Sequence, residues 1–147
     1  ELQAKCCTCY LNEGEDMITD KARKVLNKIE KSEVFFIDNG FADINQCNSL
    51  GENALHLVTI WNDIEAASVL IESGIDIDKK GEHGYTPLHE AVQQEHQHMV
   101  ELLLRNGASP IIKNNEGQNS IDLAKIHGYN KIINTLSDTI KQKSREK

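Results

Sequence analysis

A period of 33 residues runs through the sequence and constrains the fold more than any other feature. Gly51, Gly84 and Gly117 are spaced by 33 residues, and Gly74 and Gly107 have the same separation. On this spacing the segments GENALHLVTIWN, GYTPLHEAVQQE and GQNSIDLAKIHG come into register. A fixed period of this length is typical of repeat proteins, in which each unit buries its apolar face against its neighbours. The sequence therefore predicts a stack of similar units.

Each unit carries the signals of two short helices joined by a turn. Asn53, Thr86 and Asn119 occupy one column of the repeat, and each side chain can accept a hydrogen bond from a backbone N–H at a helix start. Pro87 follows Thr86, and proline is favoured at the first position of a helix. The first helices are expected to end near the members of a second column: Asn62, Glu95 and Gly128.

The second helix of each unit is marked by apolar residues at helical spacing, such as Val100, Leu103 and Leu104. It is expected to stop at Gly74 in one unit and at Gly107 in the next, because glycine suits the left-handed position that follows a helix. Aromatic residues make up 5% of the chain and prolines number two, a composition that disfavours a large β-sandwich. The predicted fold class is therefore all-α.

Residues 84–108 resemble the ankyrin repeat, whose pattern is G-x-T-P-L-H followed by L-L-L-x-x-G-A. The resemblance extends over residues 18–138 and implies an ankyrin-repeat solenoid of about four helix-turn-helix units with short extended turns between them. The units comprise a capping repeat at 17–48, repeats at 49–81 and 82–114, and a degenerate terminal repeat at 115–138. A polar, cysteine-containing segment (1–16) precedes them, and a basic tail (139–147), interpreted as a frayed helix end, follows.

The capping repeat departs from the family pattern. It lacks TPLH, and Gly40 lies one position early, with Phe41 inserted before ADIN. Such departures are expected in a unit that has a neighbour on one side only.

The resemblance implies that the TPLH histidines, His56 and His89, are structural and tie the start of their helices to adjoining repeats. A metal ion would need several side chains within about 2 Å of it. His96 and His98 are two residues apart, a spacing that directs side chains to different faces of a helix, and His83 belongs to a turn. The sequence therefore predicts no metal site among these histidines.

The four cysteines leave three interpretations open. Cys6, Cys7 and Cys9 lie close together, whereas Cys47 is distant. In an exported protein we expect the disulfides Cys6–Cys9 and Cys7–Cys47, because the other short closures are strained. Free thiols in the cytoplasm and a thiolate metal site are the alternatives.

Other functional classes find little support in the sequence. It contains no glycine-rich phosphate loop, nucleophile elbow or metalloprotease motif, so no catalytic residue and no cofactor are predicted. A formal net charge of −7 disfavours a nucleic-acid partner, and no apolar run is long enough to span a membrane. The expected partner is another protein, bound by a chain that is monomeric on its own.

In a stacked-repeat protein the partner is expected on the concave side, formed by turn tips and the ends of the first helices. Trp61 and Tyr85 are the predicted anchors, with Glu52, Glu82 and Glu116 as a negative rim. An alternative is that Trp61 packs over the seam between repeats. We call the whole set the predicted contact surface: Leu50, Glu52, Ile60, Trp61, Glu82, His83, Tyr85, Gln93, Gln94, Asn115, Glu116, Gln118, Ile126 and His127.

Three functions are compatible with these features. The first is a protein-binding module that inhibits a cognate enzyme, as in self-protection or immunity. The second is an adaptor or regulatory domain of a larger signalling or host-manipulating protein. The third, least favoured, is a metal-binding protein that uses cysteines and histidines. The chain begins at Glu1, and ELQAKCCTCY fits either the remainder of a signal peptide or a boundary within a longer chain, so an exported and a cytoplasmic location both stay open.

Overall fold

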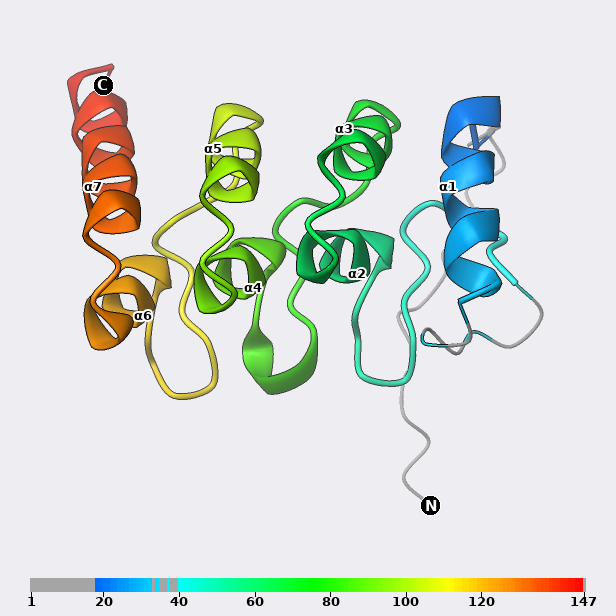
Figure 1. The fold of residues 1–147 in the computed structure, drawn as a ribbon, viewed down its shortest axis with the longest axis horizontal. Helices are drawn as coiled ribbons and strands as arrows, with labels where there is room; N and C mark the ends of the chain where they lie inside the picture. The colour runs from blue at the N-terminus through cyan, green and yellow to red at the C-terminus, as the bar shows by residue number, and fades with distance from the viewer. Residues whose placement is uncertain (1–17, 33, 35–36, 38–39, 147) are drawn as a thin grey trace.

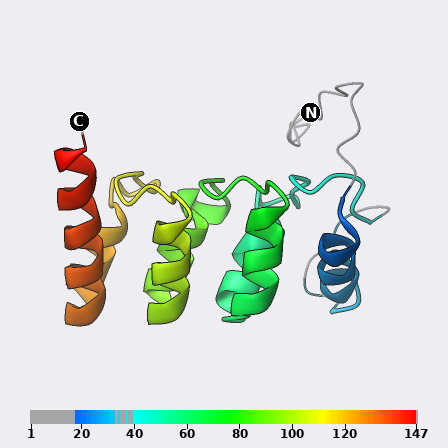
Figure 2. The ribbon, with the colours of Figure 1, turned by 90° about the horizontal axis from the view of Figure 1, so that it is seen from above.

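The computed structural model describes residues 18–32, 34, 37 and 40–146, and most of its helices form two rows (Figure 1). The first row consists of α2 (Ala54–Ile60), α4 (Pro87–Gln93) and α6 (Ser120–His127). The second row contains α3 (Ile64–Glu72), α5 (Gln97–Arg105) and α7 (Asn130–Arg145). Figure 2 shows the second row in front of the first. The predicted all-α solenoid of helix pairs is confirmed.

Long turns connect each helix pair to the next and project along one edge of the molecule (Figure 1). One of these turns contains the short 3₁₀ helix η1 (Glu82–Gly84). An isolated bridge joins Cys47 to Asn53, and no β-strand forms within the described residues.

Each first-row helix starts with the same reciprocal exchange of hydrogen bonds. The side chain of the capping residue accepts a bond from the backbone N–H three positions later. The side chain at that later position accepts one from the backbone N–H of the capping residue, at 3.1 Å in every case. The pairs are Asn53 with His56, Thr86 with His89, and Asn119 with Asp122. The predicted capping residues are confirmed, and two otherwise unbonded N–H groups are satisfied at each helix start.

The helix ends also follow the predicted columns. Asn62, Glu95 and Gly128 adopt left-handed backbone angles, with φ of 57°, 56° and 75°. The first-row helices end one or two residues before them. Gly74 and Gly107 are left-handed two residues after the last residues of the second-row helices α3 and α5.

The core lies between the two rows and runs from one unit to the next without interruption. Its fully buried side chains come from both rows and include Leu55, Leu70, Leu88, Met99, Leu103 and Leu136. Helices of the same pair pack together, and α4 also packs against α2 and α6. Because each unit buries apolar surface against the units next to it, no unit has a separate core.

The first unit differs from the others. Its described helix, α1 (Asp20–Glu30), packs mainly against α3 (Figure 1). Lys28 Nζ lies 2.8 Å from Asp63 Oδ2 at the start of α3, and Thr19 Oγ1 lies 3.1 Å from Ser73 Oγ at its end. Helix α1 therefore runs antiparallel to α3, whereas α3, α5 and α7 share one direction (Figure 1).

The last helix extends beyond residue 138, where the terminal repeat was expected to finish. Helix α7 continues to Arg145, and the Ser144 hydroxyl donates to the Ile140 carbonyl within it. No glycine or proline occurs between Asn130 and Arg145 to end the helix. Most of the segment expected as a basic tail is thus regular helix. None of the described helices combines the length and apolarity needed to cross a membrane.

Candidate binding surface

The TPLH histidines bridge adjacent units. Nδ1 of His56 accepts a hydrogen bond from the Asn53 N–H, so Nε2 carries the proton and donates to the Tyr85 carbonyl at 3.0 Å. His89 repeats this arrangement with the Thr86 N–H and with the Gln118 carbonyl at 3.2 Å. Burial lowers the pKa of both imidazoles, which favours the neutral form that these bonds require. Their predicted structural role is confirmed.

Further hydrogen bonds hold consecutive turns in register. The Asn115 N–H donates to the His83 carbonyl at 3.0 Å, and Lys80 Nζ donates to the Lys113 carbonyl at 2.7 Å. Gly84 is left-handed here, and a Cβ added to it would lie 2.5 Å from Asn115 Oδ1. The close approach of the two backbones therefore requires glycine, and the turn tips form a continuous, fixed edge.

Every residue of the predicted contact surface is at least partly exposed. Ile60 and Trp61, at the end of α2, are 36% and 37% exposed, and Leu50 is exposed in the preceding turn. The corresponding positions at the end of α4 hold Gln93 and Gln94. The repeat therefore does not demand apolar side chains at these positions. That a partner contacts them stays a prediction.

The two expected anchors differ in their surroundings. Trp61 lies at the end of a helix and keeps more than a third of its surface exposed. Tyr85 is half-buried, and its ring stacks on the imidazole of His89 with 5.5 Å between ring centroids. Tyr85 thus supports the scaffold, so its replacement would disturb stability as well as any contact with a partner.

The structure adds Glu90, which sequence reasoning missed. On the 33-residue spacing Glu90 occupies the column of Leu57 and Leu123, which are only 7% and 3% exposed. The backbone of Glu90 is hydrogen-bonded within α4, but its side-chain carboxylate makes no hydrogen bond or ion pair with another described residue. Burial, reinforced by the carboxylates of Glu52 and Glu82, raises its pKa to about 7. The sequence signal was a charged residue in a column that is otherwise leucine.

Glu90 connects the separate parts of the predicted contact surface. The carboxylates of Glu52 and Glu82 and the imidazole of His83 lie close enough to influence its charge. Burial raises the pKa of the Tyr85 hydroxyl, and the carboxylates of Glu116 and Glu90 raise it further. At the C-terminal ends of α6 and α4, His127 Nε2 lies 3.2 Å from Gln93 Oε1. Side chains from three units therefore lie on this surface, and carboxylates predominate in the part formed by the turns.

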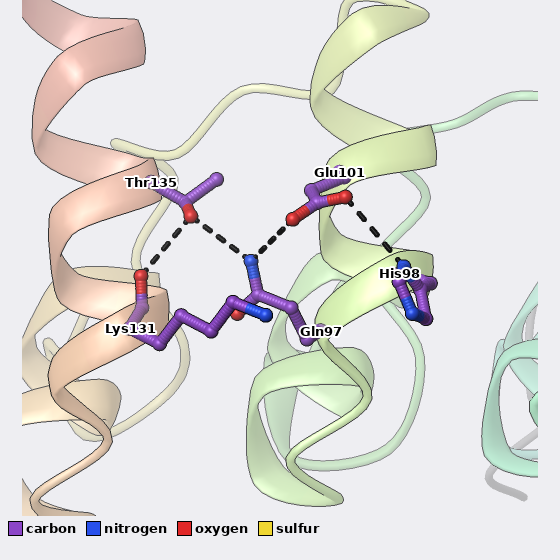
Figure 3. Close-up of polar contacts among 5 residues, drawn as sticks. All are labelled: Gln97, His98, Glu101, Lys131 and Thr135. Carbon is purple, nitrogen blue, oxygen red and sulfur yellow. Dashed lines mark hydrogen bonds and ion pairs between the residues drawn. The ribbon is translucent and has the colours of Figure 1, made fainter.

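The clustered histidines make separate contacts. His96 Nε2 bonds the Ile60 carbonyl at 3.2 Å, whereas His98 Nδ1 lies 3.7 Å from Glu101 Oε2 on the second row (Figure 3). In the same view Gln97 Nε2 donates to Glu101 Oε1 and to Thr135 Oγ1, which ties α5 to α7 (Figure 3). Among the described residues, no group of three or more His, Cys, Asp or Glu side chains is arranged to hold a metal ion.

The predicted disulfides involve residues that fall largely outside the described part of the chain. Cys47 is buried beside the turn that leads to α2. Cys6, Cys7 and Cys9 lie outside the described residues. The pairs Cys6–Cys9 and Cys7–Cys47 therefore stay predictions.

Two grooves lie away from the predicted contact surface. One, of about 440 Å³, separates α1 from α3 and has lysines along α1 and an apolar floor that includes Val25 and Val69. The other, of about 270 Å³, lies between Ile111 and Ile140 near the end of α7. Both are associated with the units at which the regular repeat is modified.

Comparison with known proteins agrees with this architecture. A family model described as ankyrin repeats (3 copies) matches residues 22–114 and 83–145. The chain is 37% identical to the human (Homo sapiens) 2-5A-dependent ribonuclease over 83 residues, which are 55% of this chain and 11% of that protein.

Two further relatives come from a plant and a virus. A putative E3 ubiquitin-protein ligase, XBAT35, of Arabidopsis thaliana is 28% identical over 101 residues, which are 67% of this chain and 22% of that protein. A putative ankyrin repeat protein, L92, of Acanthamoeba polyphaga mimivirus is 43% identical over 81 residues, which are 54% of this chain and 20% of that protein. The chain spans about a fifth or less of the length of these relatives. The match to the family model and the stacked helix pairs together show that the chain belongs to the ankyrin-repeat family.

Proposed function

We propose that this chain is a non-catalytic protein-binding module whose partner contacts the predicted contact surface. Ankyrin repeats indicate a protein–protein interaction module. The observation that carries the placement is the exposure of Ile60 and Trp61 at positions where the next unit has glutamines. A tryptophan combines a large apolar area with few rotatable bonds, so an exposed one suits a binding anchor.

The surroundings of these apolar side chains support the same proposal. Hydrogen bonds between consecutive turns fix the neighbouring tips, so a partner meets an edge that is already ordered. Binding to an ordered surface avoids much of the entropy loss that a flexible surface would incur. The rim of Glu52, Glu82 and Glu116 attracts a partner of opposite charge and speeds its association.

A narrower form of the proposal is that the partner is an enzyme, which the chain inhibits in a self-protection or immunity complex. The net charge of −7 supports it, because an acidic binder can cover a basic active-site cleft. An adaptor or regulatory domain of a larger protein is the second candidate. It is favoured by the comparisons, since the matched segments make up only 11–22% of the length of these three relatives.

The test begins with capture of partners from the source cells on the immobilised chain, followed by affinity measurements with one purified partner. Trp61→Ala is expected to weaken binding at least tenfold, with little change in melting temperature, because the side chain is not needed for the core. Ile111→Ala is the matched control, because Ile111 is apolar, 64% exposed and outside the surface. Equal affinity of the two variants would show that the surface is misplaced.

The same purified partner separates the two candidate roles. If the partner is an enzyme, an inhibitory role predicts loss of its activity on stoichiometric addition of the chain. The Trp61→Ala variant should then inhibit only at a correspondingly higher concentration. Full activity of the enzyme in the saturated complex would exclude inhibition and leave the adaptor role.

A further inference from the structure

We infer that the partner presents a cationic side chain, lysine or arginine, to Glu90, next to an apolar side chain seated on Ile60 and Trp61. This inference rests on the proposed function, because it names the chemistry of the partner for the same surface. Three features of the described residues lead to it: the column in which Glu90 stands, its lack of an internal partner, and the apolar pair on the neighbouring helix.

The first feature is the position of Glu90. Leu57 and Leu123, its counterparts in the flanking units, are almost completely buried. A carboxylate between two buried leucines loses much of its hydration without gaining packing. The scaffold does not need this charge, since leucine fills the same position in both neighbouring units.

The second feature is the balance of charge around Glu90. Glu52 from the turn before α2 and Glu82 from η1 both lie close enough to raise the pKa of Glu90, whereas His83 acts to lower it. The ammonium of Lys80, two residues before Glu82, donates a hydrogen bond to the Lys113 carbonyl rather than to a carboxylate. Among the described residues, no lysine or arginine therefore forms an ion pair with the Glu90 carboxylate. A cation supplied by a partner would gain attraction from several carboxylates at once.

The third feature is the apolar neighbour. Leu57 and Trp61 are four residues apart at the end of α2, so they share a face of that helix, and Ile60 adjoins Trp61. Lysine and arginine have long aliphatic stems, which can lie on apolar surface while the charged head reaches a carboxylate. The half-exposed ring of Tyr85 offers a further favourable contact for such a head. An amphipathic basic segment therefore matches both the charge and the apolar area of the surface.

The inference also predicts the protonation change on binding. Burial and neighbouring carboxylates raise the pKa of Glu90 to about 7, so the free protein holds a proton there in part of its population at neutral pH. A bound cation favours the carboxylate and expels that proton. Calorimetric enthalpies measured at pH 7 in buffers of different ionisation enthalpy should therefore differ in proportion to the protons released.

The experiment uses a displayed library of random peptides selected against the full chain. We expect the enriched peptides to combine a lysine or arginine with an aliphatic or aromatic residue. Their binding should weaken about tenfold or more in Glu90→Gln and in Trp61→Ala, and should be unchanged in Ile111→Ala. Replacing the basic residue of a peptide by norleucine should cause a similar loss, with little further loss in Glu90→Gln, because both changes remove one interaction.

The outcomes separate the inference from the proposed function. Peptides that lose affinity in Trp61→Ala but not in Glu90→Gln would overturn the inference and leave the proposed function standing. Peptides whose affinity is unchanged by both substitutions would contradict the inference and the proposed function alike. Enrichment of peptides without a basic residue, or failure to enrich any peptide, would overturn the inference. Glu90→Gln is a safe probe of binding, because it removes a poorly solvated charge and is expected to stabilise the fold.

Discussion

At the scale of single residues, the chain contains two kinds of buried ionisable group with opposite consequences. His56 and His89 are buried in the neutral form, and their ring nitrogens hold adjacent units together. Glu90 is half-buried among carboxylates and has no internal partner. The histidines contribute to the stability of the fold at neutral pH, whereas the glutamate opposes it.

The histidines predict a loss of stability in mild acid. Both have a pKa below 6.5 in the folded chain and near 6.5 in the unfolded chain, so below pH 6.5 the unfolded chain binds more protons. The free energy of unfolding should therefore fall as the pH is lowered from 7.5 to 5.5. Urea denaturation in a Glu90→Gln background measures this effect without the opposing titration of Glu90.

A matched comparison identifies the groups responsible for that acid sensitivity. Replacing His89 by glutamine should lower the stability at pH 7.5 and weaken the dependence on pH. An unaltered pH dependence in His89→Gln would contradict the assignment.

Glu90 predicts the opposite trend. Its pKa is raised to about 7 from a value near 4.5, so the folded chain binds more protons between these limits and loses stability as the pH rises through them. Glu90→Gln should therefore raise the free energy of unfolding at pH 8 by about 1–2 kcal/mol, since the side chain stays partly solvated. At pH 4.5 the two proteins should be nearly equal. The exposed Glu72→Gln serves as the control and should show no such gain.

At the scale of helices, the ends of the first row show how closely local sequence determines structure. The left-handed position that follows each first-row helix holds glycine only in the last unit, at Gly128, whereas the other two units have Asn62 and Glu95 there. A left-handed backbone costs a side-chain-bearing residue about 1–2 kcal/mol, and asparagine tolerates it better than glutamate. Glu95 is therefore a site of local strain that is exposed and outside the core.

This strain predicts a stabilising substitution. Glu95→Gly should raise the free energy of unfolding by about 0.5–1 kcal/mol, since relief of strain outweighs the extra freedom of glycine in the unfolded chain. Lys141→Gly, at an exposed position inside α7, should lower it by about 0.5–1 kcal/mol. Thermal or urea denaturation of both variants checks the pair. Destabilisation by Glu95→Gly would show that the Glu95 side chain stabilises the fold by more than its left-handed backbone costs.

The helices that sequence reasoning placed least well are the first and the last. The repeat pattern predicted the capping exchanges and the helix ends of the central units, because those depend on neighbours within a few positions. The direction of α1 depends on contacts with Asp63 and Ser73, which are distant in the sequence. The 33-residue pattern does not predict this direction, because the first unit lacks the TPLH motif. The length of α7 could have been predicted, since no helix-breaking residue follows Gly128 before Arg145.

Asp63 predicts how the first unit is attached. Its Oδ1 accepts a bond from the Ala66 N–H at the start of α3, and its Oδ2 pairs with Lys28 of α1. Asp63→Ala should lower the free energy of unfolding by about 1–2 kcal/mol, because the cap is lost together with the ion pair. Lys28→Ala removes the exposed ion pair alone and should therefore have a clearly smaller effect. Equal losses in urea denaturation of the two variants would contradict this division.

At the scale of the whole molecule, the repeat provides a continuous core and leaves one row of turns and helix ends available for a partner. Exposure of Ile60 and Trp61 followed from the spacing, because consensus positions are buried and the remainder is free to vary. The role of Glu90 did not follow from its own segment. Its electrostatic environment is created by Glu52 and Glu82 from other segments, so it can be recognised only once the units are assembled in the fold.

The central claim is that a protein partner binds across the turn tips and the ends of the first-row helices. Hydrogen–deuterium exchange of the chain with and without its captured partner tests this most directly. We predict slower exchange at residues 50–61, 82–94 and 115–127, with no change along the groove between α1 and α3 or beside Ile111 and Ile140. Protection confined to either of those grooves, with exchange on the predicted contact surface unaltered, would contradict the account.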